Sequence, residues 1–339
     1  MRDGEWVADT GTELRGVLKV MVDAGWLPGG VAVVGAGGLW EFVAVGRVGI
    51  ECGEAVTAPD TRYDVAELTK VMATWPLVGR AVAEGLLDLD APMRHYFPGR
   101  HPGGGVTARQ ILTHTSRLNP VTWLERYVGT DRPLAEAILD EELEQPGYRV
   151  TDRGFILLGL LLERLHRQPL DRLADDLWRH VGLSATRYGP LPRTPSVAPT
   201  ERRIPGAAAT WGVVHNENAA LMGGVAGHAG VFSTAADLGV FARELLAWHA
   251  GEHGVTRFTD FVRHSWLPHQ TVDDRFARGL AWKVTADGLV HHNGFTGTSL
   301  FLHPPTGRYV GLLTNAVHYG RRRPGLGDLR ATVRAAFTC

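Results

Sequence analysis

The chain has 339 residues, of which 44% are apolar, so it is long enough to bury a full hydrophobic core. Its formal net charge of −1 provides no broad basic field for nucleic acid, and no run of lysine or arginine forms a patch for an anionic membrane. We therefore expect a small, roughly neutral molecule as partner, with no nucleic acid and no membrane, and the oligomeric state stays open. The polar N-terminus lacks the pattern of a signal peptide, and no stretch of about 18 apolar residues occurs, which predicts a cytoplasmic protein.

Cysteine and lysine are both rare in this chain. The two cysteines, Cys52 and Cys339, lack the spacing of a metal site, and we expect no metal and no cofactor. Of the 35 basic residues only three are lysines, namely Lys19, Lys70 and Lys283, so arginine normally supplies the positive charge. Lysine can lose its proton when its surroundings lower its pKa, whereas arginine cannot. A lysine that stands inside a motif is therefore informative.

The N-terminal part alternates between helix and hairpin patterns. Apolar residues at helical spacing predict a helix over residues 11–26, which ends at the turn-prone sequence LPGG. The apolar runs GVAVVGAGG (30–38) and LWEFVAVGRVG (39–49) predict the two strands of a hairpin. Helical patterns return at residues 69–87 and 107–113, on either side of a loop rich in proline and glycine.

The pattern of the remaining chain changes from helix to strand. Residues 121–187 are predicted to be mainly helical, residues 191–209 form a proline-rich connector, and another helix is predicted at 235–251. The last segments alternate as strands, at residues 278–285, 289–294, 299–307 and 308–315.

Strands therefore occur near both ends of the chain, with helices between them. This order predicts one antiparallel sheet built from both chain ends and flanked by helices, with a helical domain inserted. We place the sheet domain at residues 1–70 and 205–339, the mainly helical domain at 71–204, and a pocket between the two. The expected fold class is mixed α/β (α+β).

One segment carries the chemistry on which the function depends. DVAELTKVMATWPLVGRAVAEG (64–85) has the flanks of a serine acyl-transfer motif, S-x-x-K, in which serine and lysine lie one helical turn apart so that the amine can take the hydroxyl proton. Residues 67–70 read E-L-T-K, so Lys70 is kept and Glu67 stands at the serine position. Acyl-enzyme chemistry through a serine is therefore excluded at position 67.

Five further segments follow this motif in order: LDLDAPMRHYFPG (87–99), ILTHTSRL (111–118), PGYRVTDRGFILLG (146–159), VHNENAALMGGVAGHAGVFSTAADL (214–238) and HNGFTGTSLFLHPPTG (292–307). Together they resemble the serine β-lactamase and penicillin-binding-protein superfamily, in particular its class C-like and esterase branch, over most of the chain. The resemblance implies the fold of that superfamily, with the active pocket between the sheet domain and the helical domain.

The resemblance also shows a change at the second motif of the superfamily. Val150 takes the place of the tyrosine that assists proton transfer, and the final polar residue is kept as Asp152. Tyr148 lies two residues before Val150, and whether it substitutes for the missing tyrosine stays open. Asp152 also precedes the apolar run GFILLG, where an aspartate is typical of a helix cap, so we expect it both to cap and to line the pocket.

The third motif is kept in the variant of the esterase branch, because it reads His292, Asn293 and Gly294. By family analogy, the oxyanion hole uses the backbone amides of Glu67 and Phe295. These amides would survive the change of side chain at position 67 unless the new carboxylate fills the hole.

Glutamate changes what the first motif can do. Glu67 is an anion one helical turn before Lys70, where i,i+3 side chains meet, so we expect an ion pair between the two. A neighbouring carboxylate favours protonated lysine, so Lys70 would be a poor base. General acid–base catalysis remains possible, and it contributes about 10² to 10⁴ in rate. The candidate catalytic residues are Glu67, Lys70, Asp152 and His292, and the candidate substrate-binding residues are Tyr148, Asn293, Gly294 and Phe295.

We therefore expect a repurposed enzyme of bacterial specialised metabolism, which acts on a small carbonyl-containing metabolite by isomerisation, cyclisation, elimination or hydration. In this hypothesis the oxyanion hole stabilises an enolate. Two alternatives stay open. One is a non-catalytic binding protein in which Glu67 and Lys70 form a structural ion pair. The other is a residual hydrolase that uses Thr69, Ser116 or a water activated by Glu67.

Overall fold

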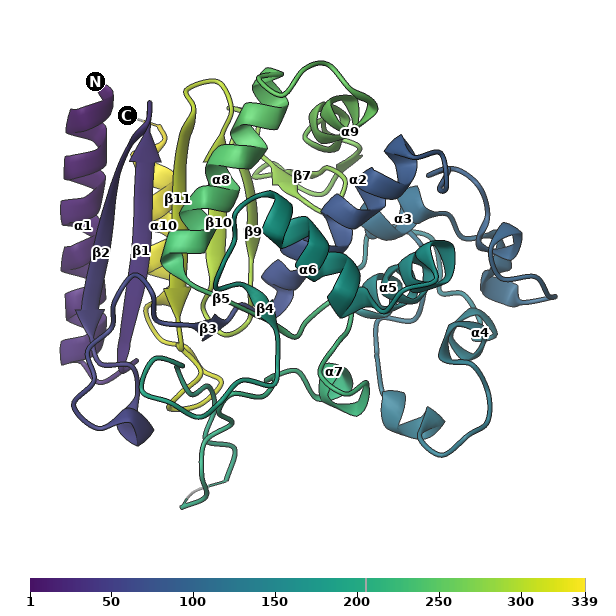
Figure 1. Cartoon of the computed structure of the whole chain (residues 1–339), viewed down its shortest axis with the longest axis horizontal. Coiled ribbons are helices and arrows are strands. Elements are labelled where there is room, and N and C mark those ends of the chain that lie inside the picture. Colours follow the sequence, from purple (N-terminus) through teal and green to yellow (C-terminus); the bar gives the residue numbers. More distant parts are fainter. Residues whose placement is uncertain (205, 339) are drawn as a thin grey trace.

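The computed structural model describes residues 1–204 and 206–338, so the prediction for Cys339 lies outside the described residues. Its main feature is an antiparallel sheet with the strand order β2-β1-β11-β10-β9-β8-β7-β6 (Figure 1). These strands span Gly29–Ala36 (β1), Leu39–Gly46 (β2), Gln270–Thr271 (β6), Ala277–Arg278 (β7), Lys283–Val284 (β8), Val290–Asn293 (β9), Ser299–His303 (β10) and Arg308–Thr314 (β11). Because β1 pairs with β11, both ends of the chain share the sheet. The prediction of an α/β (α+β) fold with this sheet is confirmed.

Helices cover both faces of the sheet. α1 (Asp3–Asp23) and α10 (Leu326–Ala336) lie on one face, and α8 (Ala235–Ala250) lies on the other (Figure 1). Successive side chains of a strand point to opposite faces. Val33 of β1 accordingly packs in the core that contains α8, and Val34 packs in the core that contains α1 and α10. A strand covered on both faces needs a continuous apolar sequence, and β1 is buried at every position.

The remaining elements pack beside the sheet and carry the second part of the molecule (Figure 1). The helices are α2 (Trp75–Ala83), α3 (Ala108–Leu112), α4 (Leu134–Leu139), α5 (Arg153–His166), α6 (Leu170–His180), α7 (Glu217–Leu221) and α9 (Arg257–Ser265). A small sheet joins β3 (Tyr63–Asp64), β5 (Val231–Ser233) and β4 (Arg187–Tyr188). One buried apolar cluster includes both α5 and α8. The domain boundaries at residues 70 and 205 stay a prediction.

Several elements differ from the expectation. α1 begins at Asp3, earlier than residue 11, because acidic residues in its first turn stabilise the helix start. The helix predicted from residue 69 starts as a π-helical turn, Lys70–Thr74, before α2. The strand predicted at 278–285 is instead a tight hairpin, since Ala281 has a left-handed φ of 72° between β7 and β8. The segment between α4 and α5 is irregular although its region was predicted mainly helical, and α9, α10 and strands β3 to β6 were not predicted.

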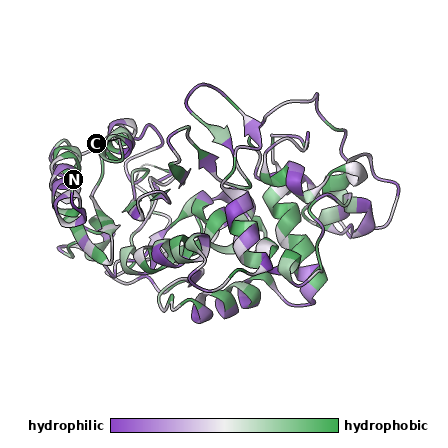
Figure 2. Cartoon of the chain, turned by 90° about the horizontal axis from the view of Figure 1, so that it is seen from above, coloured by the Kyte–Doolittle hydropathy of each residue, from purple (hydrophilic) through white to green (hydrophobic). Residues whose placement is uncertain are grey.

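The helices carry both hydrophilic and hydrophobic residues (Figure 2). Within residues 1–204 and 206–338, none of them is long and apolar enough to cross a membrane.

Candidate active site

A cavity of about 590 Å³ lies where the C-terminal end of β9 meets the start of the π-helical turn and the loop before α5. It brings together residues that are far apart in the sequence. The predicted site residues that line it are Glu67, Lys70, Asp152, His292, Asn293, Gly294 and Phe295. Tyr148 does not line it.

The charged pair of this cavity is Lys70 with Asp152, and the expected Glu67–Lys70 ion pair is not formed. Lys70 Nζ lies 2.6 Å from Asp152 Oδ1, with the lysine side chain 2% exposed and the aspartate 26% exposed. Burial opposes ionisation of Asp152, but the charge and hydrogen bond of Lys70 outweigh it and lower the pKa of Asp152 to about 2. Asp152 is the N-cap residue of α5, yet its side chain makes no capping hydrogen bond because it binds Lys70 instead.

Glu67 fills the place that the resemblance assigns to the oxyanion hole. Its Oε2 accepts a hydrogen bond from the backbone N–H of Phe295 at 2.5 Å, and its carboxylate also accepts one from its own backbone N–H. These are the two amides of the expected hole. Stabilisation of an enolate by these amides, which we expected from the sequence, is therefore not available while the carboxylate is in place.

The surroundings of Glu67 raise the pKa of its carboxyl group and so favour the protonated form. Burial raises the pKa of Glu67, and the negative charge of Asp152 raises it further. The charge of Lys70 and the two backbone hydrogen bonds lower the pKa in part, but the direction of the net shift is upward. A carboxyl group with a raised pKa exchanges protons closer to neutral pH than an ordinary glutamate does.

A strained turn places Glu67 at the cavity. Ala66 has a φ of 50°, which a residue with a Cβ rarely adopts, and its N–H donates to Asp64 Oδ1 at 2.8 Å. The other oxygen of Asp64 accepts from the N–H of His215 at 2.6 Å. Asp64 therefore ties the turn before Glu67 to a segment that is far away in the sequence.

Gly294 lets the end of β9 approach this turn. A Cβ at position 294 would lie 2.6 Å from the carbonyl oxygen of Val65 and would also collide with Thr298. We expect Gly294→Ala to lower the free energy of unfolding by about 1–3 kcal/mol, because backbone must move apart to make room. Urea unfolding measures this. Gly16→Ala is the control, since no atom lies within 4 Å of its added Cβ and alanine favours the helix. Equal effects of the two changes would contradict the close approach.

Two residues of the third motif line this cavity, and each has a polar atom to which the described residues offer no partner. Within the described residues, His292 Nδ1 and Asn293 Oδ1 are buried and have no hydrogen-bond partner. Burial lowers the pKa of His292 well below its usual range, and the charges of Arg278 and Lys70 lower it further. His292 is therefore a neutral imidazole, which can donate from one nitrogen and accept at the other. Both residues are available to bind a ligand.

Tyr148 does not replace the tyrosine that is missing at position 150. Its hydroxyl accepts a hydrogen bond from Arg278 Nη2 at 2.6 Å, and its ring packs against the same guanidinium. Tyr148 supports a residue of the cavity wall and is not itself part of the wall.

The alternative nucleophiles, Thr69 and Ser116, make hydrogen bonds within the fold. Thr69 Oγ1 is buried and accepts from the N–H of Val231 at 3.2 Å, and Ser116 Oγ is buried beside the N–H of Leu118 at 3.4 Å. Neither residue lines the cavity. Among residues 1–204 and 206–338, no group of three or more His, Cys, Asp or Glu is placed to hold a metal ion.

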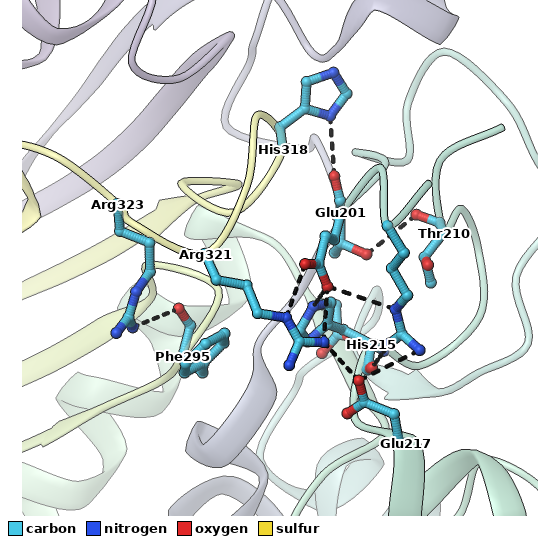
Figure 3. Close-up of polar contacts among 11 residues, drawn as sticks. Glu201, Thr210, His215, Glu217, Phe295, His318, Arg321 and Arg323 are labelled. Atoms are coloured by element: carbon cyan, nitrogen blue, oxygen red, sulfur yellow. Dashed lines mark hydrogen bonds and ion pairs between the residues drawn. The ribbon is translucent and has the colours of Figure 1, made fainter. Parts of the chain in front are cut away.

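A polar network behind Phe295 fixes the residue whose amide meets Glu67 (Figure 3). Glu201 accepts two hydrogen bonds from Arg321, at 2.8 and 2.9 Å, and lies 2.8 Å from His215 Nε2. The His215 ring stacks on the Phe295 ring with 5.8 Å between centroids. Arg323 lies 4.1 Å from the Phe295 centroid and donates to its carbonyl oxygen at 3.0 Å. These contacts hold both the ring and the backbone of Phe295.

Sequence reasoning missed four cationic residues of the cavity wall, Arg278, Lys283, Arg323 and Arg330. Arginine carries no signal in a chain that uses it for nearly all positive charge. The rarity of lysine did single out Lys283, but its position outside any motif gave it no assignment.

Comparisons with known proteins agree with the observed fold. A family model described as Beta-lactamase matches residues 14–335. A proposed D-alanyl-D-alanine carboxypeptidase of Salmonella enteritidis is 27% identical over 307 residues, which cover 76% of this chain and 70% of that protein. The class C β-lactamase of Rhodobacter sphaeroides superimposes with a TM-score of 0.77 at 18% identity, covering 96% of this chain and 99% of its own. A β-lactamase/D-alanine carboxypeptidase of Pseudomonas syringae gives a TM-score of 0.76 at 16% identity, with the same two coverages.

Proposed function

Since the chain belongs to the β-lactamase family and carries glutamate at the position of that family's nucleophilic serine, we propose that it is an enzyme that moves protons on a small carbonyl-containing molecule without a covalent intermediate. The observation that carries this proposal is the Glu67 carboxyl group, which lies at the cavity, bound to the Phe295 amide and with a raised pKa. The setting in bacterial specialised metabolism stays a prediction from the sequence.

Each charged group has a separate role in this reaction. Glu67, when ionised, removes a proton from carbon next to the carbonyl group and returns it to another atom of the substrate. Lys70 is held by Asp152 and supplies a fixed positive charge near the negative charge that develops on the carbonyl oxygen. The neutral His292 and Asn293 orient the substrate through their free polar atoms. No bond to the protein forms or breaks.

The test is exchange of carbon-bound hydrogen for deuterium. The full chain is incubated in D₂O with a panel of 2-oxo and 3-oxo carboxylic acids, and proton NMR follows the signal next to the carbonyl group. We expect faster exchange with at least one compound and no acceleration by Glu67→Gln. Equal acceleration by both proteins would contradict proton transfer at Glu67, and no acceleration of any compound would favour the binding-protein alternative.

That alternative has a specific observation in its favour, because the Glu67 carboxylate occupies the expected oxyanion hole. Such a protein would bind a ligand in the same cavity and release it unchanged. The exchange measurement separates the two functions, since only an enzyme alters the isotope content of the ligand.

We expect the chain to lack the hydrolytic chemistry of its relatives. A penicillin should leave no covalent adduct on the wild-type chain, and a peptide ending in D-Ala-D-Ala should release no D-alanine, because the serine position is Glu67 and neither Thr69 nor Ser116 reaches the cavity. Intact-mass spectrometry and D-alanine analysis check both points. Glu67→Ser is the companion variant, since it frees the Phe295 amide. An adduct on the wild-type chain, or release of D-alanine by it without an adduct through a water activated by Glu67, would restore the hydrolase alternative.

A further inference from the structure

The cavity carries more positive charge than its carboxylates balance. The cationic lining residues are Lys70, Arg278, Lys283, Arg323 and Arg330, and the acidic ones are Glu67 and Asp152. Lys70 is paired with Asp152. Within the described residues, none of the other four cations forms an ion pair, so together they face Glu67 alone. The overall charge of −1 conceals this local excess.

The β7–β8 hairpin places two of these cations directly opposite each other. Arg278 and Lys283 are cross-strand partners in register, and like charges in such a pair destabilise a sheet. Burial lowers the pKa of Lys283 to about 8, and the repulsion from Arg278 and Arg330 contributes. The repulsion between these two charges therefore opposes folding.

Both side chains also keep unused hydrogen-bonding capacity. Arg278 is 3% exposed, and its Nε has no hydrogen-bond partner among the described residues. Lys283 packs over the Phe276 ring, 4.7 Å from its centroid, and its ammonium group has no hydrogen bond to the described part of the chain. A buried guanidinium and a free ammonium side by side offer the donors that a carboxylate or phosphate group accepts.

Arg323 and Arg330 add charge beside the loop that follows β9. Arg330 donates to the carbonyl oxygens of Gly294 and Thr298, at 2.8 and 3.0 Å, so its hydrogen bonds hold the loop after β9. Carbonyl groups do not neutralise its charge. Burial and the neighbouring Arg323 lower the pKa of Arg330 to about 10, and it stays charged at neutral pH.

We infer that the cavity binds a small molecule that carries two negative charges, either a phosphate monoester or a dicarboxylate. A single carboxylate would leave most of the positive charge unbalanced, whereas a dianion can meet Arg278 and Lys283 and still approach Lys70. The inference rests on the proposed function, in which this cavity is the substrate site. It adds the charge of that substrate. This substrate differs from the roughly neutral partner that we expected from the sequence.

The test measures binding and not turnover. Isothermal titration calorimetry of the full chain at pH 7 and fixed ionic strength uses inorganic phosphate, succinate and acetate as probes. We expect phosphate or succinate to bind roughly tenfold or more tightly than acetate, because a second charge-assisted contact forms. The stronger of the two dianions identifies the substrate class. Equal binding of all three probes would overturn the inference.

Two variants, one in β8 and one in the turn between β6 and β7, sharpen the result. Lys283→Gln should weaken binding of the dianion roughly tenfold or more, whereas Arg275→Gln should leave it unchanged, since Arg275 is 80% exposed and paired with Asp273. Urea unfolding should show that Lys283→Gln is at least as stable as the wild type, because a repulsion is removed. Equal effects of the two variants on binding would contradict the assignment. Glu67→Gln should still bind the dianion, so a failure of catalysis is distinguishable from a failure of binding.

Discussion

Replacing Glu67 with glutamine should reduce proton transfer by a factor of about 10² to 10⁴, and it should also stabilise the fold. Glutamine keeps the shape of the side chain and can still accept the hydrogen bond from Phe295 N–H, but it cannot take a proton from a substrate. An exchange assay in D₂O measures the first effect and urea unfolding at pH 7 measures the second.

The gain in stability follows from the raised pKa of Glu67. The folded chain holds this proton more tightly than the unfolded chain, so stability falls as the pH rises from about 4.3 through the pKa of the folded state. At higher pH the buried carboxylate costs about 1.4 kcal/mol for each unit by which its pKa is raised. Glutamine removes that cost.

A control variant is Glu13→Gln, because Glu13 is exposed on α1, and its effect on stability should stay within about 0.5 kcal/mol. A Glu67→Gln protein that is less stable than the wild type would show that the carboxylate is a structural anchor. A Glu67→Gln protein that keeps full activity would exclude Glu67 as the base.

Asp152→Asn should cost about 3–5 kcal/mol of stability, the largest loss that we expect from a single polar change in this chain. Lys70 is 2% exposed and has Asp152 as its ion-pair partner, so the variant leaves a buried ammonium without a counter-ion. The control is Asp23→Asn, which breaks the Lys19–Asp23 pair on α1. That pair is 2.9 Å long but both side chains are exposed, so the loss should be below about 1 kcal/mol.

The Lys70–Asp152 pair also makes the stability depend on pH, with a definite sign. The pKa of Asp152 is lowered to about 2, so its contribution to stability is complete above its unfolded pKa of about 3.9 and is lost as the pH falls towards 2. The difference in unfolding free energy between wild type and Asp152→Asn should therefore shrink over this interval. A difference that stays constant from pH 5 to pH 2, or equal losses for Asp152→Asn and Asp23→Asn, would contradict the buried pair.

The sequence predicted which residues meet at the site but not how they pair. Motif order brought Glu67, Lys70, Asp152 and His292 to one cavity. Local spacing favoured Glu67 with Lys70, yet Lys70 binds Asp152, which stands at a helix N-terminus far away in the sequence. The Phe295 amide competes for the Glu67 carboxylate, and a contact between backbone and a distant side chain has no pattern in the sequence.

The sequence also predicted only part of the fold, for a similar reason. The strands at both chain ends were predictable because β1 and β11 are long apolar runs. The β7–β8 hairpin was not, since its turn uses the left-handed Ala281 rather than a glycine or asparagine. That turn brings Arg278 and Lys283 opposite each other. The sequence therefore did not predict that these two cationic residues lie together in the cavity wall.

The most direct measurement is the titration of the Glu67 carboxyl group. Carbon-13 NMR of the full chain, labelled at glutamate carboxyl groups, follows this signal with pH, and its absence from Glu67→Gln assigns it. We expect a midpoint above the ordinary glutamate value of about 4.3, so that Glu67 takes and returns protons closer to neutral pH than an ordinary glutamate does. A midpoint at or below that value would mean that Glu67 is a permanent anion of the oxyanion hole, and proton transfer at this residue would be refuted.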